Sequence, residues 1–264
     1  MTGRRQLALV GPRAARASRL YRLLMRGVRL LGRGLFEFRT DVVGAELLPL
    51  DRAGLPAGGW IAAGLPHRTW VDPFVVADNL PLEPRLVFFG DGRAIFRSRW
   101  RRLVFRTIGG VIPIWPGGGR AAVDAHLEAA GAALSAGAVL CLFPETGPAT
   151  APGTARPLGL GIAYLVLRTG APVVAIVLGG THELYRGRQF RLQVLPAMTA
   201  RELAGLAADA PLPEPWSRAE RDMAHRIVAA LHALTVEPIA AAHAMTEAPP
   251  HARKRWRWLT TAWH

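Results

Sequence analysis

The stretch Leu65-Pro66-His67-Arg68-Thr69-Trp70-Val71-Asp72 follows an apolar run over residues 60–65 that is typical of a β-strand. It places an imidazole, His67, and a carboxylate, Asp72, five residues apart. Histidine takes up a proton near neutral pH, and a carboxylate on its second ring nitrogen fixes the tautomer and stabilises the imidazolium. Such a pair suits activation of an alcohol for attack on an acyl group. A histidine with an aspartate nearby is common, so the surrounding motifs decide what this pair means.

A second stretch, Leu142-Phe143-Pro144-Glu145-Thr146-Gly147, places another carboxylate, Glu145, behind a second strand-like run. From residue 58 onward, runs of strand length alternate with segments of helical periodicity. Strands are expected at 60–65, 85–89, 111–114, 138–143 and 172–178, and helices at 70–80, 94–107, 119–136 and 157–169. This alternation favours an α/β fold with a mostly parallel sheet flanked by helices. Segments 36–48 and 189–196 are expected to add edge strands to a mixed sheet, and a last helix is expected from Ser217.

In open parallel sheets, ligands bind outside the carboxyl ends of the strands. The side chains expected at those ends are His67 and Asp72, Asp91 and Arg93, Arg120, Glu145, and His182. One edge of the sheet is therefore predicted to collect an imidazole, carboxylates, a glycine-rich turn and arginines, which together make a plausible active site.

The 264-residue chain carries a formal net charge of +14, and 50% of its residues are hydrophobic. That content supports a sizeable core, and the length fits one α/β domain with terminal extensions or two small domains. The excess positive charge predicts an anionic partner: nucleic acid, an anionic membrane surface, or acidic or phosphorylated substrates. Cys141 is the single cysteine, so no disulfide framework exists and a reducing compartment is expected. We expect Cys141 to be a buried hydrophobe and not a nucleophile.

Residues 14–36 have the clearest helical pattern in the chain. Arginines recur every three or four residues on one side, and apolar residues fall on the opposite side: Leu20, Tyr21, Leu24, Val28, Leu31 and Leu35. Two interpretations stay open. One is a surface helix with a solvated arginine face, and the other is a helix in the membrane interface whose arginines meet anionic headgroups. Because the charges have one sign, we predict that residues 1–36 form an amphipathic, membrane-associating segment.

The chain ends in tryptophans interleaved with basic residues, a pattern of interfacial anchors, for which a disordered basic tail is the alternative. We therefore divide the chain into the segment 1–36, a main domain over 37–243 and a basic aromatic tail over 244–264. No uninterrupted apolar run approaches the ~20 residues that span a bilayer. We expect a peripheral protein on the cytoplasmic side of the cell membrane. Nucleic acid is not expected as a partner, because no folded recognition motif accompanies the tail.

Four blocks, in this order, resemble the glycerolipid acyltransferases, whose best-known members are the 1-acylglycerol-3-phosphate (lysophosphatidic acid) acyltransferases. The blocks are the His67-x4-Asp72 motif, the Gly110–Ile114 segment, Phe143-Pro144-Glu145 followed by Thr-Gly, and the Ala171–Val177 strand. They occur at intervals similar to those of the family across about residues 40–200. The first block alone is a weak signal, but together with the downstream Phe-Pro-Glu it is specific.

The resemblance implies an O-acyltransferase of phospholipid biosynthesis that moves a fatty acyl group from acyl-CoA or acyl carrier protein to a hydroxyl of a lysophospholipid-like acceptor. His67 would act as general base on that hydroxyl, oriented by Asp72. Glu145, Thr146 and Gly147 would help to bind the acceptor. This chemistry needs no metal and no covalent enzyme intermediate, so the resemblance implies no cofactor besides the acyl donor substrate.

Two phosphate-binding motifs of the family are altered here. Where the family usually has Asp-Arg after I-P-I, this chain has Trp115-Pro116, and the family's E-G-T-R-S becomes Glu145-Thr146-Gly147-Pro148-Ala149. Either Arg93, Arg120 or Arg156 binds the acceptor phosphate, or the acceptor is altered or broader than lysophosphatidic acid. The loss of two arginines favours the second reading, because a phosphate normally takes bidentate arginine contacts. The same changes leave open a catalytically degenerate membrane- or lipid-binding protein on the acyltransferase scaffold.

Overall fold

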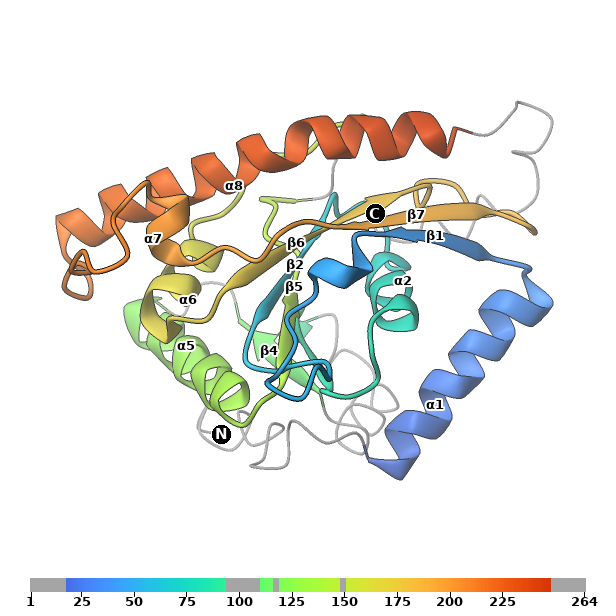
Figure 1. Ribbon diagram of the computed structural model, residues 1–264, viewed down its shortest axis with the longest axis horizontal. Coiled ribbons are helices and arrows are strands. Elements are labelled where there is room, and N and C mark those ends of the chain that lie inside the picture. Colours follow the sequence, from blue (N-terminus) through green and yellow to red (C-terminus); the bar gives the residue numbers. More distant parts are fainter. Residues whose placement is uncertain (1–17, 94–109, 116–118, 148–150, 248–264) are drawn as a thin grey trace.

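The computed structural model describes residues 18–93, 110–115, 119–147 and 151–247 (Figure 1). Within these residues, seven strands form one sheet in the order β1-β7-β6-β2-β5-β3-β4. The strands are β1 (Arg39–Val43), β2 (Ile61–Leu65), β3 (Leu86–Asp91), β4 (Val111–Ile114), β5 (Val139–Leu142), β6 (Val173–Gly179) and β7 (Gln189–Val194). The helices are α1 (Arg19–Arg29), α2 (Asp72–Asn79), α5 (Gly119–Ser135), α6 (Gly161–Thr169), α7 (Ala200–Leu203) and α8 (Arg218–Met245), with a π-helical turn η3 (Leu30–Leu35) and a 3₁₀ turn η4 (Ala45–Leu47). The helix predicted at 94–107 lies outside the described residues.

The pairing of the strands confirms the predicted mixed, mostly parallel sheet. Strand β2 pairs in parallel with β5 and β6, and β3 pairs in parallel with β5 and β4. Strand β7 runs antiparallel to β6, and β1 runs parallel to β7. The two segments predicted as extra strands, 36–48 and 189–196, therefore lie side by side at one edge of the sheet as the shorter β1 and β7.

Alternate side chains of the central strands enter two apolar clusters, one on each face of the sheet. Ile61, Ala63 and Leu65 of β2 pack in a cluster with residues of α5, α6 and α8. Ala62 of β2 belongs to the opposite cluster, together with Tyr21 of α1 and residues of α2. The sheet is thus the middle of three layers, with α8 along one side of the molecule and α1 along the other (Figure 1).

The N-terminal helical segment docks on the domain through its arginine side, which is the opposite of the first of the two interpretations, a surface helix with a solvated arginine face. Ser18 caps α1 by accepting a hydrogen bond from the backbone N–H of Tyr21 at 3.1 Å, and only Tyr21 and Met25 of α1 are buried. Three arginines turn toward the protein, where Arg22 pairs with Glu83 and both Arg29 and Arg33 pair with Asp78. The leucines face outward and are 43–74% exposed: Leu20, Leu23, Leu24, Leu30, Leu31 and Leu35. The interpretation as a surface helix that packs on the domain through its leucines and leaves its arginines in solvent is therefore wrong.

Helix α8 is the one helix of the described residues that is long and apolar enough to cross a membrane, by length and composition alone. Its polar residues interrupt the apolar ones, so a search for uninterrupted apolar runs misses it. One stripe of the helix, which includes Ile227, Leu231 and Ile239, is buried in the cluster that covers β6. The buried stripe accounts for part of the apolar composition of α8, since 33% of the apolar window is buried.

The close approach of α8 to β6 depends on Gly179. A Cβ atom at this position would lie 2.5 Å from the backbone oxygen of Ala242 in α8. We expect Gly179→Ala to lower the free energy of unfolding by about 1–3 kcal/mol, because helix and strand must separate. Denaturant titration measures this loss. Gly161→Ala is the control, because a Cβ there meets open space at the start of α6, and a loss of the same size in both variants would contradict the prediction.

Candidate active site

The His67 and Asp72 side chains meet at the carboxyl end of β2, as predicted. The distance from His67 Nδ1 to Asp72 Oδ2 is 2.9 Å. Asp72 is fully buried, whereas the side chain of His67 is 29% exposed and can be reached from outside. With the Nδ1 proton donated to Asp72, Nε2 becomes the atom that can take a proton from a substrate.

The carboxylate of Asp72 also shapes the loop that carries the histidine. Its Oδ2 atom accepts hydrogen bonds from the backbone N–H groups of Arg68 at 2.6 Å and of Thr69 at 2.7 Å. Asp72 is the first residue of α2, where the helix dipole favours a negative charge. Backbone donors and the imidazole thus converge on one oxygen, which fixes the position of the ring.

An aromatic ring packs against one face of the His67 imidazole. Phe143, at the end of β5, stacks on His67 with ring centroids 4.3 Å apart and an interplanar angle of 27°. The Phe143 ring lies over Gly64 of β2, where a Cβ atom would come within 2.4 Å of it. Gly64 thereby leaves the space that Phe143 needs to stack on His67.

Glu145 lies next to the pair, but its carboxylate is used by the protein itself. One oxygen accepts the backbone N–H of His67, and the other accepts the backbone N–H of Arg156 at 2.7 Å. Residues 144–146 run alongside 157–159, with the Thr146 N–H donating to the Pro157 carbonyl at 3.1 Å. Burial raises the pKa of Glu145, and the hydrogen bonds from the two backbone amides oppose that rise. The sequence places Glu145 among the acceptor-binding residues, whereas the structure shows it bracing two loops.

Two arginines border this edge of the sheet. The guanidinium of Arg68 donates to the backbone carbonyls of Ala151 and Thr154, and burial lowers its pKa while the carboxylates of Glu145 and Asp72 raise it. The guanidinium of Arg156 lies beside Gly147, where a Cβ atom would be 3.1 Å from its Nη1. Gly147 has a φ of 125°, a conformation that favours glycine. The structure therefore brings Arg156 and Gly147 together next to Glu145.

The other two predicted arginines lie apart from these contacts. Arg93 follows β3, is exposed, and donates its backbone N–H to Asp91 at 2.8 Å. Arg120, at the start of α5, stacks its guanidinium over the Trp216 ring at 4.7 Å. Trp216 also contacts Arg168, which is paired with the buried Glu220. Among the described residues, Arg120 therefore contacts Trp216 of a distant segment, and its part in acceptor binding stays a prediction.

Arg68 and Phe143 are the site residues that sequence reasoning missed. Both are inside the two motif stretches, directly after His67 and before Pro144. Their positions next to motif residues are the signal in the sequence that points to them. The partners of Arg68, which are backbone carbonyls within 151–154, and the stacking of Phe143 on the His67 ring follow only from tertiary packing.

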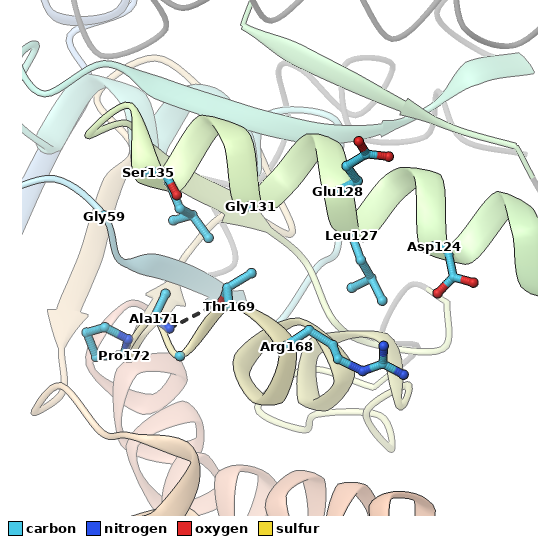
Figure 2. A pocket seen from close by; sticks show the side chains of 12 residues that line it. Gly59, Asp124, Leu127, Glu128, Gly131, Ser135, Arg168, Thr169, Ala171 and Pro172 are labelled. Carbon is cyan, nitrogen blue, oxygen red and sulfur yellow. Dashed lines mark hydrogen bonds between the residues drawn. The ribbon is translucent and has the colours of Figure 1, made fainter. Parts of the chain in front are cut away.

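An apolar cavity of about 260 Å³ opens next to the His67 loop, between η3 and α2. Trp70 and Val71 of the loop line one side, and Leu31, Phe74 and Phe190 line others. A second cavity, of about 650 Å³, lies at the opposite end of the strands, between α5 and the turn that follows α6 (Figure 2). Its charged side chains are Asp124, Glu128 and Arg168, and it contains none of the residues predicted for the site.

The described residues contain no group of three metal-ligating side chains. Cys141 is fully buried within β5, and burial raises the pKa of its thiol well above the ordinary value. A thiol in this environment is unsuited to act as a nucleophile, which agrees with the expectation of a buried hydrophobe.

Comparisons with known proteins agree with this arrangement. The family model described as Acyltransferase matches residues 54–179, which hold β2 through β6. A crystal structure of the 1-acyl-sn-glycerophosphate (LPA) acyltransferase PlsC from Thermotoga maritima matches with a TM-score of 0.51 and 18% sequence identity, over 83% of this chain and 82% of that chain. At that identity the structural match supports the fold alone. No curated protein gives a significant match to the chain.

The α/β fold is thus similar to that of a solved acyltransferase, and the segment that carries His67 lies within the residues that match the Acyltransferase family model. Residues 54–179 match the Acyltransferase family model, which confirms the predicted resemblance to the glycerolipid acyltransferases.

The raised pKa of Glu145 predicts a pH dependence of stability. Because the native carboxyl holds its proton more tightly than the unfolded one, the free energy of unfolding falls as pH rises through the interval between the two pKa values. Glu145→Gln removes this titration. Urea unfolding between about pH 4 and pH 7 should therefore show the stability of the wild type, relative to the variant, decreasing with pH. A difference that is constant or grows with pH would contradict the assignment.

Proposed function

We propose that the protein transfers a fatty acyl group from a thioester donor, acyl-CoA or acyl carrier protein, to a hydroxyl of a lysophospholipid-like acceptor. The observation that carries the proposal is the 2.9 Å contact between His67 Nδ1 and Asp72, on a partly exposed imidazole at the carboxyl edge of the sheet, within the residues that match the Acyltransferase family model. A general base in that position suits attack by an alcohol, because proton removal makes the oxygen nucleophilic.

The proposed reaction needs only these two side chains for its proton transfers. His67 Nε2 takes the proton of the acceptor hydroxyl while the hydroxyl oxygen attacks the thioester carbonyl carbon. Asp72 stabilises the imidazolium, and collapse of the tetrahedral intermediate breaks the carbon–sulfur bond. The departing thiolate takes the proton back from the imidazolium. The products are the ester and a free thiol, with no covalent intermediate on the enzyme.

The acceptor is proposed to lie beside the segment 145–147. The guanidinium of Arg156, next to Gly147, offers an anionic headgroup the bidentate contact that the altered motifs lack. Exposed Thr146 adds a hydroxyl on the same segment. Glu145 would act through the two loops that it braces, and Arg93, at the end of β3, would meet negative charge at the rim.

The fatty acyl chain is proposed to occupy the apolar cavity beside Trp70. The cavity is lined mostly by apolar side chains, and it opens next to the loop that holds the base. Burial of a hydrocarbon chain contributes ~0.8 kcal/mol for each methylene removed from water.

Loss of the base tests the proposal directly. We expect His67→Ala and Asp72→Asn to lower thioester-dependent acylation of lysophospholipids by about 10²–10⁴-fold, the usual contribution of general-base catalysis. Mass spectrometry of products from a panel of donors and acceptors measures the loss, with circular dichroism as the check on folding. His225→Ala, an exposed histidine on α8, is the control. Full activity in both site variants would refute the mechanism.

A degenerate lipid-binding protein is the second candidate function. It is favoured by the transposed Thr146-Gly147 pair and by the use of both Glu145 oxygens for backbone contacts. The same assay separates the two functions, since product formation by the purified wild type excludes the degenerate protein. Lipid binding without turnover for any donor and acceptor would support it.

We propose further that the protein docks peripherally on the cytoplasmic face of the cell membrane through the outward leucines of α1 and η3. These side chains form an exposed apolar face, with Arg19 and Arg26 exposed alongside it. An interfacial helix of this kind inserts its apolar face among the acyl chains while flanking arginines meet anionic headgroups. The basic aromatic tail over 244–264, most of it outside the described residues, is proposed as a second contact.

Charge placed on the leucine face should weaken docking. We expect Leu23→Asp/Leu30→Asp to reduce binding to anionic phospholipid vesicles by at least about tenfold, because two leucines no longer enter the apolar layer. Vesicle flotation measures the change. Leu234→Asp on α8, where the leucine is 45% exposed, is the matched control. Equal binding by both variants would exclude this face as the membrane contact.

A further inference from the structure

Arg29 of α1 occupies the C-terminal end of α2. Its Nη2 atom donates hydrogen bonds to the backbone carbonyls of Asp78 at 2.8 Å and of Leu80 at 3.3 Å. Its Nε atom lies 3.2 Å from the Asp78 carboxylate. The last carbonyls of a helix have no partner within the helix, and a cation is favourable at that end of the dipole. Arg29 therefore caps a helix that belongs to a different part of the chain.

Further contacts fasten the same end of α2. Arg33 reaches the Asp78 carboxylate through Nε at 3.1 Å and through Nη2 at 3.0 Å. Asn79 donates to the Thr40 hydroxyl of β1 at 3.2 Å. Tyr21 and Met25 of α1 lie in the apolar cluster that also contains Val75, Val76 and Leu80. The Arg29 side chain is 30% exposed, compared with 57% for Arg33, so Arg29 is the more enclosed of the two cations.

The opposite end of α2 carries the catalytic carboxylate. Asp72 begins the helix, and no side chain caps its N-terminus. A helix of eight residues spans about 12 Å and is marginal by itself, so its position depends on its packing and its end contacts. A displacement at the Arg29 end is transmitted along this short rigid body to Asp72, and from there to the His67 ring at 2.9 Å.

The geometry points to Arg29 as a positioning residue for the His67–Asp72 pair, acting through α2. Arg29 lies on the helical segment whose leucines face outward, and it reaches the site through α2. The docking of α1 on the domain and the alignment of His67 therefore depend on the same side chain. It rests on the proposed function for its effect on catalysis, but the effect on the His67–Asp72 hydrogen bond is independent of turnover.

The test uses the full-length protein in steady-state kinetics with lysophospholipid vesicles and acyl-CoA. We expect Arg29→Ala to lower kcat by about tenfold to a hundredfold, the usual effect of a small misplacement of a catalytic group, with little change in KM. Arg226→Ala, which removes an exposed arginine of α8 outside both the site and the proposed membrane face, is the control and should retain wild-type kcat. Arg29→Lys keeps the charge but not the forked geometry, so it should recover only part of kcat.

A second readout does not depend on activity. The imidazole proton shared with Asp72 gives a low-field proton NMR signal, which Asp72→Asn identifies by removing it. We expect this signal to weaken or disappear in Arg29→Ala and to persist in Arg226→Ala. A purely structural role for Arg29 would lower the melting temperature and leave the signal and kcat unchanged at temperatures where the variant is folded.

The outcomes separate the two proposals. An inactive wild type that loses the signal in Arg29→Ala would refute the proposed function and leave the positioning role standing. An active wild type whose Arg29→Ala variant matches Arg226→Ala in kcat and in the signal would overturn the positioning role alone. If Arg29→Ala does not fold, Arg29→Lys compared with Arg226→Lys decides, and equal kcat in those two variants overturns the inference.

Discussion

Between β2 and α2, three donors converge on one buried carboxylate oxygen of Asp72: the His67 ring and the backbone amides of Arg68 and Thr69. A carboxylate that is removed from water needs such donors, because an unpaired buried charge costs several kcal/mol. The loop therefore has one favourable shape, and that shape presents the imidazole at the carboxyl edge of the sheet. The bonds that fold the loop also orient the imidazole that we propose as the general base. A substitution at Asp72 consequently changes local structure and chemistry together.

Glu145, which follows the neighbouring strand β5, is likewise a carboxylate that accepts hydrogen bonds from backbone amides. Its two oxygens accept backbone amides from His67 and Arg156, which lie on either side of it in space. The carboxylate thus fixes the distance between the His67 loop and the segment 156–159. Under the proposed function, recognition of an acceptor falls to the groups that Glu145 arranges, among them Arg156 beside Gly147. In this chain the glutamate of the Phe-Pro-Glu motif holds the His67 loop and the segment at Arg156 together.

Much of this arrangement could be predicted from the sequence, because the central strands are buried on both faces. Strands β2, β5 and β6 are continuous apolar runs and were located to within one residue at each end. Their carboxyl ends then follow from parallel pairing, which places His67, Asp72 and Glu145 at one edge. The position of Arg120 could not be predicted, since its partner Trp216 is distant in sequence and is reached only through packing. The same holds for Arg68, whose carbonyl partners lie more than eighty residues away.

The orientation of α1 shows a different limit. Periodicity defines two faces of a helix but does not say which face meets the protein. Here the decision depends on Asp78 and Glu83, because these carboxylates give Arg29, Arg33 and Arg22 partners on the domain. With the arginines turned inward, the leucines are left outside, where an apolar face of this size is unfavourable in water and favourable in a bilayer interface. The arginines that attach α1 therefore also leave exposed the leucine face that we propose to contact lipid, and Arg29 among them contacts the end of the helix that begins with Asp72.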